Sequence, residues 1–163
     1  MPDMTNLIRS LLWFGAIGCG LLAGVYFAFS TFIMTAFGRI EPAKGVSAMS
    51  SINSTILRSL FMPFFYGTTI VSVVLVIVAL SRRGEPGSVA MLAGGLIYIA
   101  GMTLCTIFFN VPLNNTLDVI DPASGAAASI WSHYLRAWTL WNHVRTISST
   151  ATCALYIAAI AAT

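Results

Sequence analysis

The stretch at residues 59–81 reads SLFMPFFYGTTIVSVVLVIVALS, and it runs for 23 residues without a charge between Arg58 and Arg82. An α-helix needs about 20 apolar residues to cross the hydrocarbon core of a bilayer. A charged side chain at mid-bilayer is costly, so a gap of this length between charges is informative. The stretch therefore predicts a membrane-spanning helix at residues 60–81.

Three further charge-free stretches lie along the chain. Twenty-nine residues separate Arg9 from Arg39, 32 separate Glu85 from Asp118, and 18 follow Arg145. Together the four stretches predict spans at residues 11–35, 60–81, 89–110 and 145–162. The last span is the shortest and is expected to extend toward its N-terminal side. We expect residues 1–163 to form a single all-α membrane domain, a four-transmembrane-helix bundle with partly helical connections on one face.

The composition agrees with a membrane protein. Charged residues make up 8% of the 163 positions, against about 25% in a typical soluble domain. Hydrophobic residues make up 58%, and the mean hydropathy is +0.87. The net charge of +3 rests on scattered cations, and the one adjacent pair is Arg82-Arg83. A soluble globular fold, a disordered chain and a nucleic-acid-binding module are therefore excluded, and the expected partner is the lipid bilayer.

Four spans place both termini on one side of the membrane, together with the short connection at residues 81–87. By the positive-inside rule, Arg82, Arg83 and Arg9 favour the cytoplasm for that side. The rule is ambiguous here, because the opposite side holds more cations: Arg39, Lys44, Arg58, Arg136 and Arg145. We expect a multi-pass protein of the cell membrane with cytoplasmic termini.

Small residues recur every four positions in the first and last spans. Such stripes let helix backbones approach closely. We expect them to pack against other helices of the chain, and a homo-oligomer would use the same faces. The stripes are Ala16, Gly20, Gly24 and Ala28, and Ala154, Ala158 and Ala162.

The third span ends in FFNVPLNNTLD at residues 108–118. Pro112 lacks an N–H and disfavours helix at the residue before it, so the helix is expected to kink or stop near Asn110. Two interpretations stay open. In the first, the asparagines cap a helix end. In the second, Asn110 and Asn114 project into a polar cavity between the helices.

Residues 131–146 carry the richest set of side chains. At 100° per residue, five large side chains and an amide share one helical face, an arc about 100° wide. His143 and Arg136 fall on a different face. An interfacial belt of Trp and Tyr is the alternative interpretation. The residues that share the face are Trp131, Tyr134, Trp138, Trp141, Asn142 and Arg145.

An arginine that enters a span indicates a functional site with a partner to be named. For Arg145 the expected partners are the acidic residues Asp118 and Glu41. A metal site is weakly supported, because His133 and His143 are ten residues apart and do not share one helical face. No cofactor fingerprint is present in the sequence, so neither a metal nor an organic cofactor is expected.

Several strings together resemble the anthrone-oxygenase-like membrane proteins. They are NVPLNN at 110–115, Trp131, WxxWNHxRT at 138–146, GVYFAFS at 24–30, and the region of Asn53, Arg58 and Phe64. The resemblance covers essentially the whole chain. It implies a small four-helix membrane protein and, from the characterised members, oxidation of an anthrone to an anthraquinone without an evident organic cofactor or metal.

That reaction needs a base, donors for an enolate oxygen and flat apolar walls. We assign His143 as the base and Arg145 with Asn110 or Asn114 as the oxyanion site. The expected walls and further contacts to a hydrophobic aromatic molecule are Trp131, Tyr134, Trp138, Trp141, Asn142, Arg58 and Asn53.

A non-enzymatic membrane protein is the alternative, either a binder of a hydrophobic small molecule or a helix-packing scaffold. Convergence of Arg145, Asn110, Asn114 and His143 on one cavity would favour the enzyme over this alternative. Dispersal of these four side chains would count against it.

Overall fold

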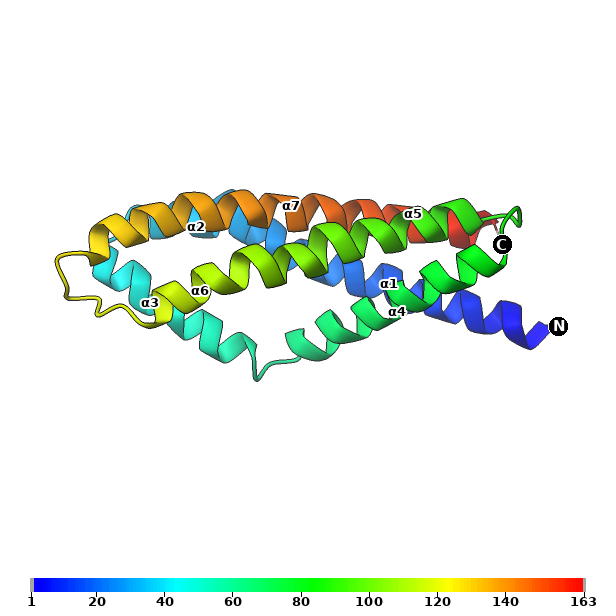
Figure 1. Cartoon of the computed structure of the whole chain (residues 1–163), viewed down its shortest axis with the longest axis horizontal. Helices are drawn as coiled ribbons and strands as arrows, with labels where there is room; N and C mark the ends of the chain where they lie inside the picture. The colour runs from blue at the N-terminus through cyan, green and yellow to red at the C-terminus, as the bar shows by residue number, and fades with distance from the viewer. Residues whose placement is uncertain (1, 163) are drawn as a thin grey trace.

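The computed structural model of the protein describes residues 2–162. Four helices of this part of the chain are long and apolar enough to cross a membrane: Met4–Phe37, Phe61–Ser81, Ser88–Asp118 and Ala127–Ala162. They lie roughly side by side as one elongated bundle (Figure 1). The predicted all-α membrane fold with four spans is therefore confirmed.

The spans are built from shorter elements, some of them π-helical. In chain order they are α1 (Pro2–Ala28), η1 (Phe29–Ile33), α2 (Met34–Phe37), α3 (Pro42–Ile56), α4 (Phe61–Ser81), α5 (Ser88–Tyr98), η2 (Ile99–Leu104), η3 (Thr106–Asn110), α6 (Val111–Asp118) and α7 (Ala127–Ala162).

The two ends of the bundle differ. Both termini and the tight α4–α5 turn lie at one end (Figure 1), and that turn uses the positive φ angles of Gly84 and Gly87. The other end holds α3 and the connection between α6 and α7. The N-terminal end of α4 diverges from α6, and α3 lies at the same end of the bundle (Figure 1). The predicted helical connection on this face is thus present as α3.

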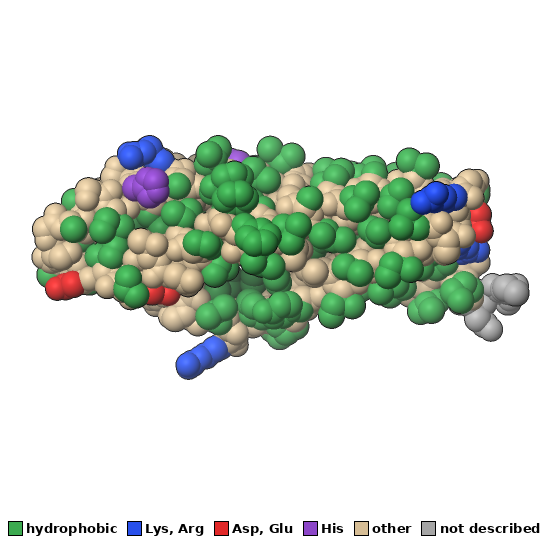
Figure 2. Space-filling model, in the orientation of Figure 1, with side chains coloured by type: hydrophobic (Ala, Val, Ile, Leu, Met, Phe, Trp, Pro, Cys, Tyr) green, Lys and Arg blue, Asp and Glu red, His purple; other side chains and the backbone are tan. Residues whose placement is uncertain are grey.

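The surface is apolar between two charged ends. Lys, Arg, Asp and Glu side chains gather at the ends, and hydrophobic side chains cover the middle of the face shown in Figure 2. Large apolar side chains such as Phe32, Ile70, Ile77 and Ile147 are exposed. A surface of this kind is stable against lipid and not against water. The chain is a membrane protein.

The third span does not stop at Asn110. It runs on to Asp118, and the backbone changes to π-helix in η2 and η3 before α6 begins with Pro112 in its first turn. Proline cannot donate to the helix ladder and its ring crowds the preceding turn. π-helical turns change the hydrogen-bond register ahead of it, so the chain passes Pro112 without leaving the helix.

The fourth span is longer than residues 145–162. The helix α7 begins at Ala127 and continues unbroken for 36 residues, about 54 Å at 1.5 Å per residue. Its buried side chains form one stripe along its whole length, aromatic near Trp131 and Tyr134 and rich in hydroxyls near Ser148 and Ser149. One straight helix therefore joins the long-connection end of the bundle to the turn end.

The small-residue stripes pack against other helices only in part: Ala16 is buried in the core, and a Cβ built on Gly20 would lie 3.7 Å from the Cys153 Sγ of α7. Ala154, Ala158 and Ala162 are exposed, and a Cβ built on Gly24 would meet nothing within 4 Å. The buried side of α1 presents Leu12, Ala16, Cys19 and Tyr26, and the repeat leaves this side by Gly24. Intramolecular packing therefore holds for Ala16 and Gly20 and not for the rest of the stripes, because a spacing of four drifts off a face that repeats every 3.6 residues. A homo-oligomer through them stays a prediction.

Two other glycines make room for an aromatic ring that crosses the core between the helices. The ring of Tyr156 is fully buried and lies against Gly15 of α1 and Gly94 of α5, with ring carbons 2.9 Å and 2.8 Å from the positions that Cβ atoms would take. Its hydroxyl donates to the Ser72 Oγ over 2.9 Å. Tyr156 thus ties α7 to three other helices.

We expect Gly94→Ala to lower the free energy of unfolding by about 1–3 kcal/mol, because the new methyl overpacks the Tyr156 ring. The matched control is Gly24→Ala, where nothing lies within 4 Å. This control is expected to be neutral or to stabilise by up to about 1 kcal/mol through higher helix propensity. Thermal unfolding of the purified variants in detergent measures both. Equal effects of the two substitutions would contradict the packing described for Tyr156.

Candidate functional site

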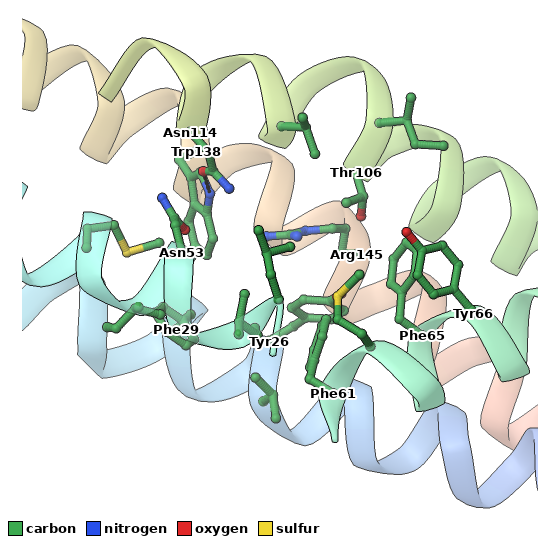
Figure 3. Close-up of a pocket in the computed structure, with 18 residues that line it drawn as sticks. Tyr26, Phe29, Asn53, Phe61, Phe65, Tyr66, Thr106, Asn114, Trp138 and Arg145 are labelled. Atoms are coloured by element: carbon green, nitrogen blue, oxygen red, sulfur yellow. Dashed lines mark hydrogen bonds between the residues drawn. The ribbon is translucent and has the colours of Figure 1, made fainter. Parts of the chain in front are cut away.

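A cavity of about 260 Å³ lies among the helices near the long-connection end of the bundle. Figure 3 shows its lining, to which all four spans and α3 contribute. Most of the lining is apolar or aromatic. The polar members are Tyr26, Asn53, Tyr66, Thr106, Asn114 and Arg145.

Arg145 is the one charged side chain among the described residues that line the cavity, and it is only 5% exposed. Its guanidinium carbon lies 4.4 Å from the centroid of the Tyr26 ring and 4.8 Å from that of the Trp138 ring. A cation over the face of such rings gains about 0.5–2 kcal/mol. Two aromatic faces therefore hold the guanidinium, and Figure 3 shows it pointing into the cavity.

Asn142 fixes the guanidinium from the same helix. Its Nδ2 donates to the Tyr26 carbonyl over 2.7 Å and to the Ser30 Oγ over 2.8 Å. A carbonyl can only accept, so the amide must turn its Oδ1 to Arg145, whose Nη2 donates to it over 2.6 Å. The Thr146 hydroxyl donates to the Asn142 carbonyl, so Ser30 donates to Thr146 across 3.1 Å. This network of hydrogen bonds joins α7 to Tyr26 of α1 and Ser30 of η1.

The expected acidic partner of Arg145 is not there. Among residues 4–162, whose side chains the structure describes, the ion pairs are Lys44 with Glu41 and Arg82 with Glu85, each between residues three apart in the sequence. Asp118 is exposed. An amide and two rings replace the carboxylate, so the cavity carries an unneutralised positive charge, and its Arg145 Nε has no hydrogen-bond partner.

Asn114 is oriented in the same way. Its Oδ1 accepts from the Tyr134 hydroxyl over 2.8 Å and from the Trp138 Nε1 over 2.9 Å. An indole N–H is only a donor, so the carbonyl side of the amide must face Trp138. The Nδ2 of Asn114 is thereby left to face the cavity as a donor.

Further polar atoms of the lining lack protein partners. The Tyr26 hydroxyl and the Asn53 Nδ2 are buried and make no hydrogen bond. A buried donor without a partner costs about 1–3 kcal/mol. Together with Arg145 Nε, these atoms are hydrogen-bond donors that the protein leaves available at the cavity.

An aromatic stack leads away from the cavity along α7. The rings of Trp131 and Tyr134 have centroids 5.6 Å apart, and those of Tyr134 and Trp138 are 6.2 Å apart. Phe29 lies 5.5 Å from Trp138 on the other side. Of these rings Trp138 and Phe29 line the cavity, while Trp131 and Tyr134 pack behind them. Within the stripe predicted from the 3.6-residue period, Trp131, Tyr134 and Trp138 form an interior stack and not a belt facing lipid.

Several of the expected site residues lie elsewhere. Asn110 is buried outside the cavity lining, where its Nδ2 donates to the Trp138 carbonyl over 3.3 Å. Trp141 stacks on Phe109 at 3.6 Å between centroids. Arg58 and His143 are exposed, and His143 belongs to a separate surface hollow with Met34. The cavity brings together Arg145, Asn114, Asn53 and Trp138, with Asn142 directly behind.

Several residues of the cavity that lie on other helices were not predicted from the sequence. Tyr26 carries the second ring over Arg145, and Phe29, Phe61, Phe65 and Thr106 complete the walls. The string GVYFAFS at residues 24–30 held a usable signal, since it places an aromatic ring and Ser30 one turn apart beside a π-helical segment. The contact between Tyr26 and Arg145 depends on the height of α1 relative to α7. A helical wheel drawn for one helix does not contain this information.

No group of three or more His, Cys, Asp or Glu side chains that could hold a metal ion is found among residues 4–162, whose side chains the structure describes. His133 and His143 are both exposed and line different hollows. The polar groups that converge on the cavity are guanidinium, amides and hydroxyls, which suit an anionic or carbonyl oxygen.

The model of one protein family, described as anthrone oxygenase, matches residues 57–155. The chain belongs to the anthrone oxygenase family. The matched stretch holds Asn114, Trp138 and Arg145, while Tyr26 and Asn53 lie before it. The sequence resemblance is thereby confirmed. No curated protein and no solved structure matches the chain.

Replacing Asn114 by Ala should lower the free energy of unfolding by about 1–3 kcal/mol, because it leaves the Tyr134 hydroxyl and the Trp138 N–H unpaired. The neighbouring Asn115 is exposed, so Asn115→Ala should stay within about 0.5 kcal/mol. Thermal unfolding in detergent distinguishes the two variants of this anthrone oxygenase family member. Equal stability would show that the Asn114 carbonyl does not hold the aromatic stack.

Proposed function

We propose that this protein binds a flat, enolisable aromatic ketone of the anthrone class in the cavity and oxidises it with dioxygen. The observation that carries the proposal is Arg145, a buried guanidinium that faces an aromatic cavity and has no acidic partner. Membership of the anthrone oxygenase family supports it.

The chemistry begins at the methylene that lies between the two rings of an anthrone, opposite the carbonyl. Loss of one proton from this carbon gives an enolate, with the negative charge on the former carbonyl oxygen. Donors that favour the enolate over the ketone accelerate this step. The guanidinium of Arg145 and the Asn114 Nδ2 are the groups that meet such an oxygen here, and Asn142 keeps the guanidinium in place.

Dioxygen then takes up the electrons. The enolate carbon forms a C–O bond with dioxygen, which is reduced to a peroxide. The remaining proton on that carbon leaves as the O–O bond breaks, so the carbon becomes a carbonyl and the outer oxygen leaves as water. One anthrone and one dioxygen give one anthraquinone and one water. The chain's residues contribute by holding the enolate and by excluding bulk water from the reacting carbon.

The shape of the cavity suits a flat guest. Trp138, Phe29, Phe61 and Phe65 supply aromatic walls, and the volume of about 260 Å³ lies just below the range of about 300–1,000 Å³ for small-molecule sites. Aromatic faces stack on flat rings at little entropic cost. A fused tricyclic ring system with one ionisable oxygen fits this combination of walls and charge.

The proposed proton acceptor is water and not a side chain of the cavity. Among the described residues that line the cavity none is Asp, Glu or His. We propose that the proton passes to a water molecule held inside the cavity, and that stabilisation of the enolate by Arg145 makes this transfer favourable. His143, the base expected from the sequence, lies on another surface and stays a separate hypothesis.

A second function is favoured by the same observation about the lining. A cavity with a cation but no carboxylate or imidazole could bind an aromatic anion without turning it over. This non-enzymatic binder would take up anthraquinones and anthrones alike. Turnover separates it from the oxygenase.

We also propose a location. The turn with Arg82 and Arg83 and the α1 end with Arg9 lie at one end of the bundle, which favours the cytoplasmic side of the cell membrane for both termini. The cavity then lies toward the opposite side of the membrane.

The main test is oxygen uptake by the purified protein in detergent with 1,8-dihydroxyanthrone as probe. We expect Arg145→Met to reduce kcat/KM by about 100-fold or more, as for loss of an oxyanion donor. Arg136→Met is the matched control, since Arg136 lies on the same helix, is exposed and bonds only to Ser132 among the contacts found. Equal rates for the two variants would refute the role of Arg145. Binding without oxygen uptake by the unmodified protein would favour the non-enzymatic binder.

His143→Ala decides between the two proposals for the base. We expect its kcat/KM to stay within about twofold of the unmodified protein, because the imidazole lies outside the cavity and typical general-base losses are about 100-fold or more. A loss of that size, with unchanged thermal unfolding, would restore His143 as the base and would require α7 to present it differently during turnover.

A further inference from the structure

The cavity has a mouth made of apolar side chains from different helices. Leu57 follows α3, Tyr66 belongs to α4, and Ile107 and Val111 belong to η3 and α6. All four line the cavity and are also exposed, Tyr66 by 57% and Ile107 by 49%. In contrast, Arg145 at the inner end is 5% exposed. The cavity therefore opens sideways, between the N-terminal half of α4 and the η3–α6 segment, where these helices diverge (Figure 1).

The mouth lies within the hydrocarbon thickness. Tyr66 is 15 residues from Ser81 at the turn end of α4, which is about 23 Å along a helix. Arg145 is 17 residues from Ala162, about 26 Å by the same measure. Ala162 and Glu85 line one surface hollow, so both distances start from the same level. Since the hydrocarbon core is about 30 Å thick, the mouth opens to lipid and not to water.

Polarity rises from the mouth inward. The four rim residues are Leu, Ile, Val and a Tyr, while the deep end presents Arg145 Nε and the Tyr26 hydroxyl without partners. A neutral aromatic molecule dissolved in the bilayer can pass an apolar rim at little cost, whereas an anion cannot. Its oxygen then meets donors only inside the cavity.

We infer that the ligand enters and leaves this cavity laterally from the bilayer, in its uncharged form, through the gap between α4 and the η3–α6 segment. The inference rests on the proposed ligand site, but it does not depend on turnover. The ligand class is thereby a lipid-soluble aromatic phenol or enol that carries no fixed charge, and Tyr66 and Ile107 set the rate at which it passes.

The test follows binding of 1,8-dihydroxyanthraquinone, which air does not oxidise further, to the protein in phosphatidylcholine vesicles. Stopped-flow fluorescence of the probe gives the association and dissociation rates. Ile107→Trp narrows the mouth, so we expect both rates to fall about tenfold while Kd changes by less than about threefold, as for a barrier outside the bound state. Tyr66→Ala widens the mouth, and both rates should rise.

The matched control is Ile77→Trp, an equally drastic substitution at a lipid-exposed position of α4 (61% exposed) that does not line the cavity. It should leave both rates unchanged. If Ile107→Trp does not slow binding, or if Ile77→Trp slows it equally, lateral passage through this gap is wrong. Failure of the unmodified protein to bind the probe overturns this inference together with the proposed site. Binding that Ile107→Trp slows, in a protein that oxidises no anthrone, leaves lateral passage standing while the oxidation fails.

Discussion

The placement of one guanidinium inside an apolar bundle is the constraint on which the site depends. Arg145 is buried where no carboxylate reaches it, so its charge is balanced by two aromatic faces and one amide oxygen. Each of these partners is itself fixed by a neighbour. Asn142 is oriented by the Tyr26 carbonyl, and Trp138 is held by Asn114. Because leaving a buried charge unsatisfied is costly, the first, third and fourth spans can associate in few other ways without losing stability.

That arrangement leaves the charge available. A carboxylate beside Arg145 would satisfy it fully and would compete with any anionic guest. Rings and an amide stabilise the cation without cancelling its field, and low local polarity makes that field stronger than it would be in water. The site thus combines two properties that usually exclude each other: it tolerates a cation in the empty state, and it retains attraction for an oxygen that gains negative charge.

The sequence predicted the parts of the molecule that depend on composition and on one helix at a time. Charge-free stretches located the four spans, and the 3.6-residue period placed Trp131, Trp138 and Arg145 on one buried face while it put His143 on another. Contacts between helices were not predictable in this way. Tyr26 lies more than a hundred residues from Arg145, and its height relative to α7 is set by packing. The π-helical turns before Asn110 allow the helix to continue past Pro112. The sequence rule for proline predicts only a kink or an end of the helix, so it could not predict these turns.

The length of α7 has a consequence for the membranes in which this protein works. At about 54 Å the helix exceeds the roughly 30 Å hydrocarbon core, and Arg145 lies close to the level at which one lipid leaflet ends. Bilayers differ in thickness by a few ångströms, and helices respond by tilting or by deforming the lipid around them. In a thinner bilayer the same side chain lies at the headgroups, and in a thicker one it lies beneath the acyl chains. Hydrophobic mismatch therefore changes how far the Arg145 side chain lies from water, so lipid composition affects the polarity of its surroundings.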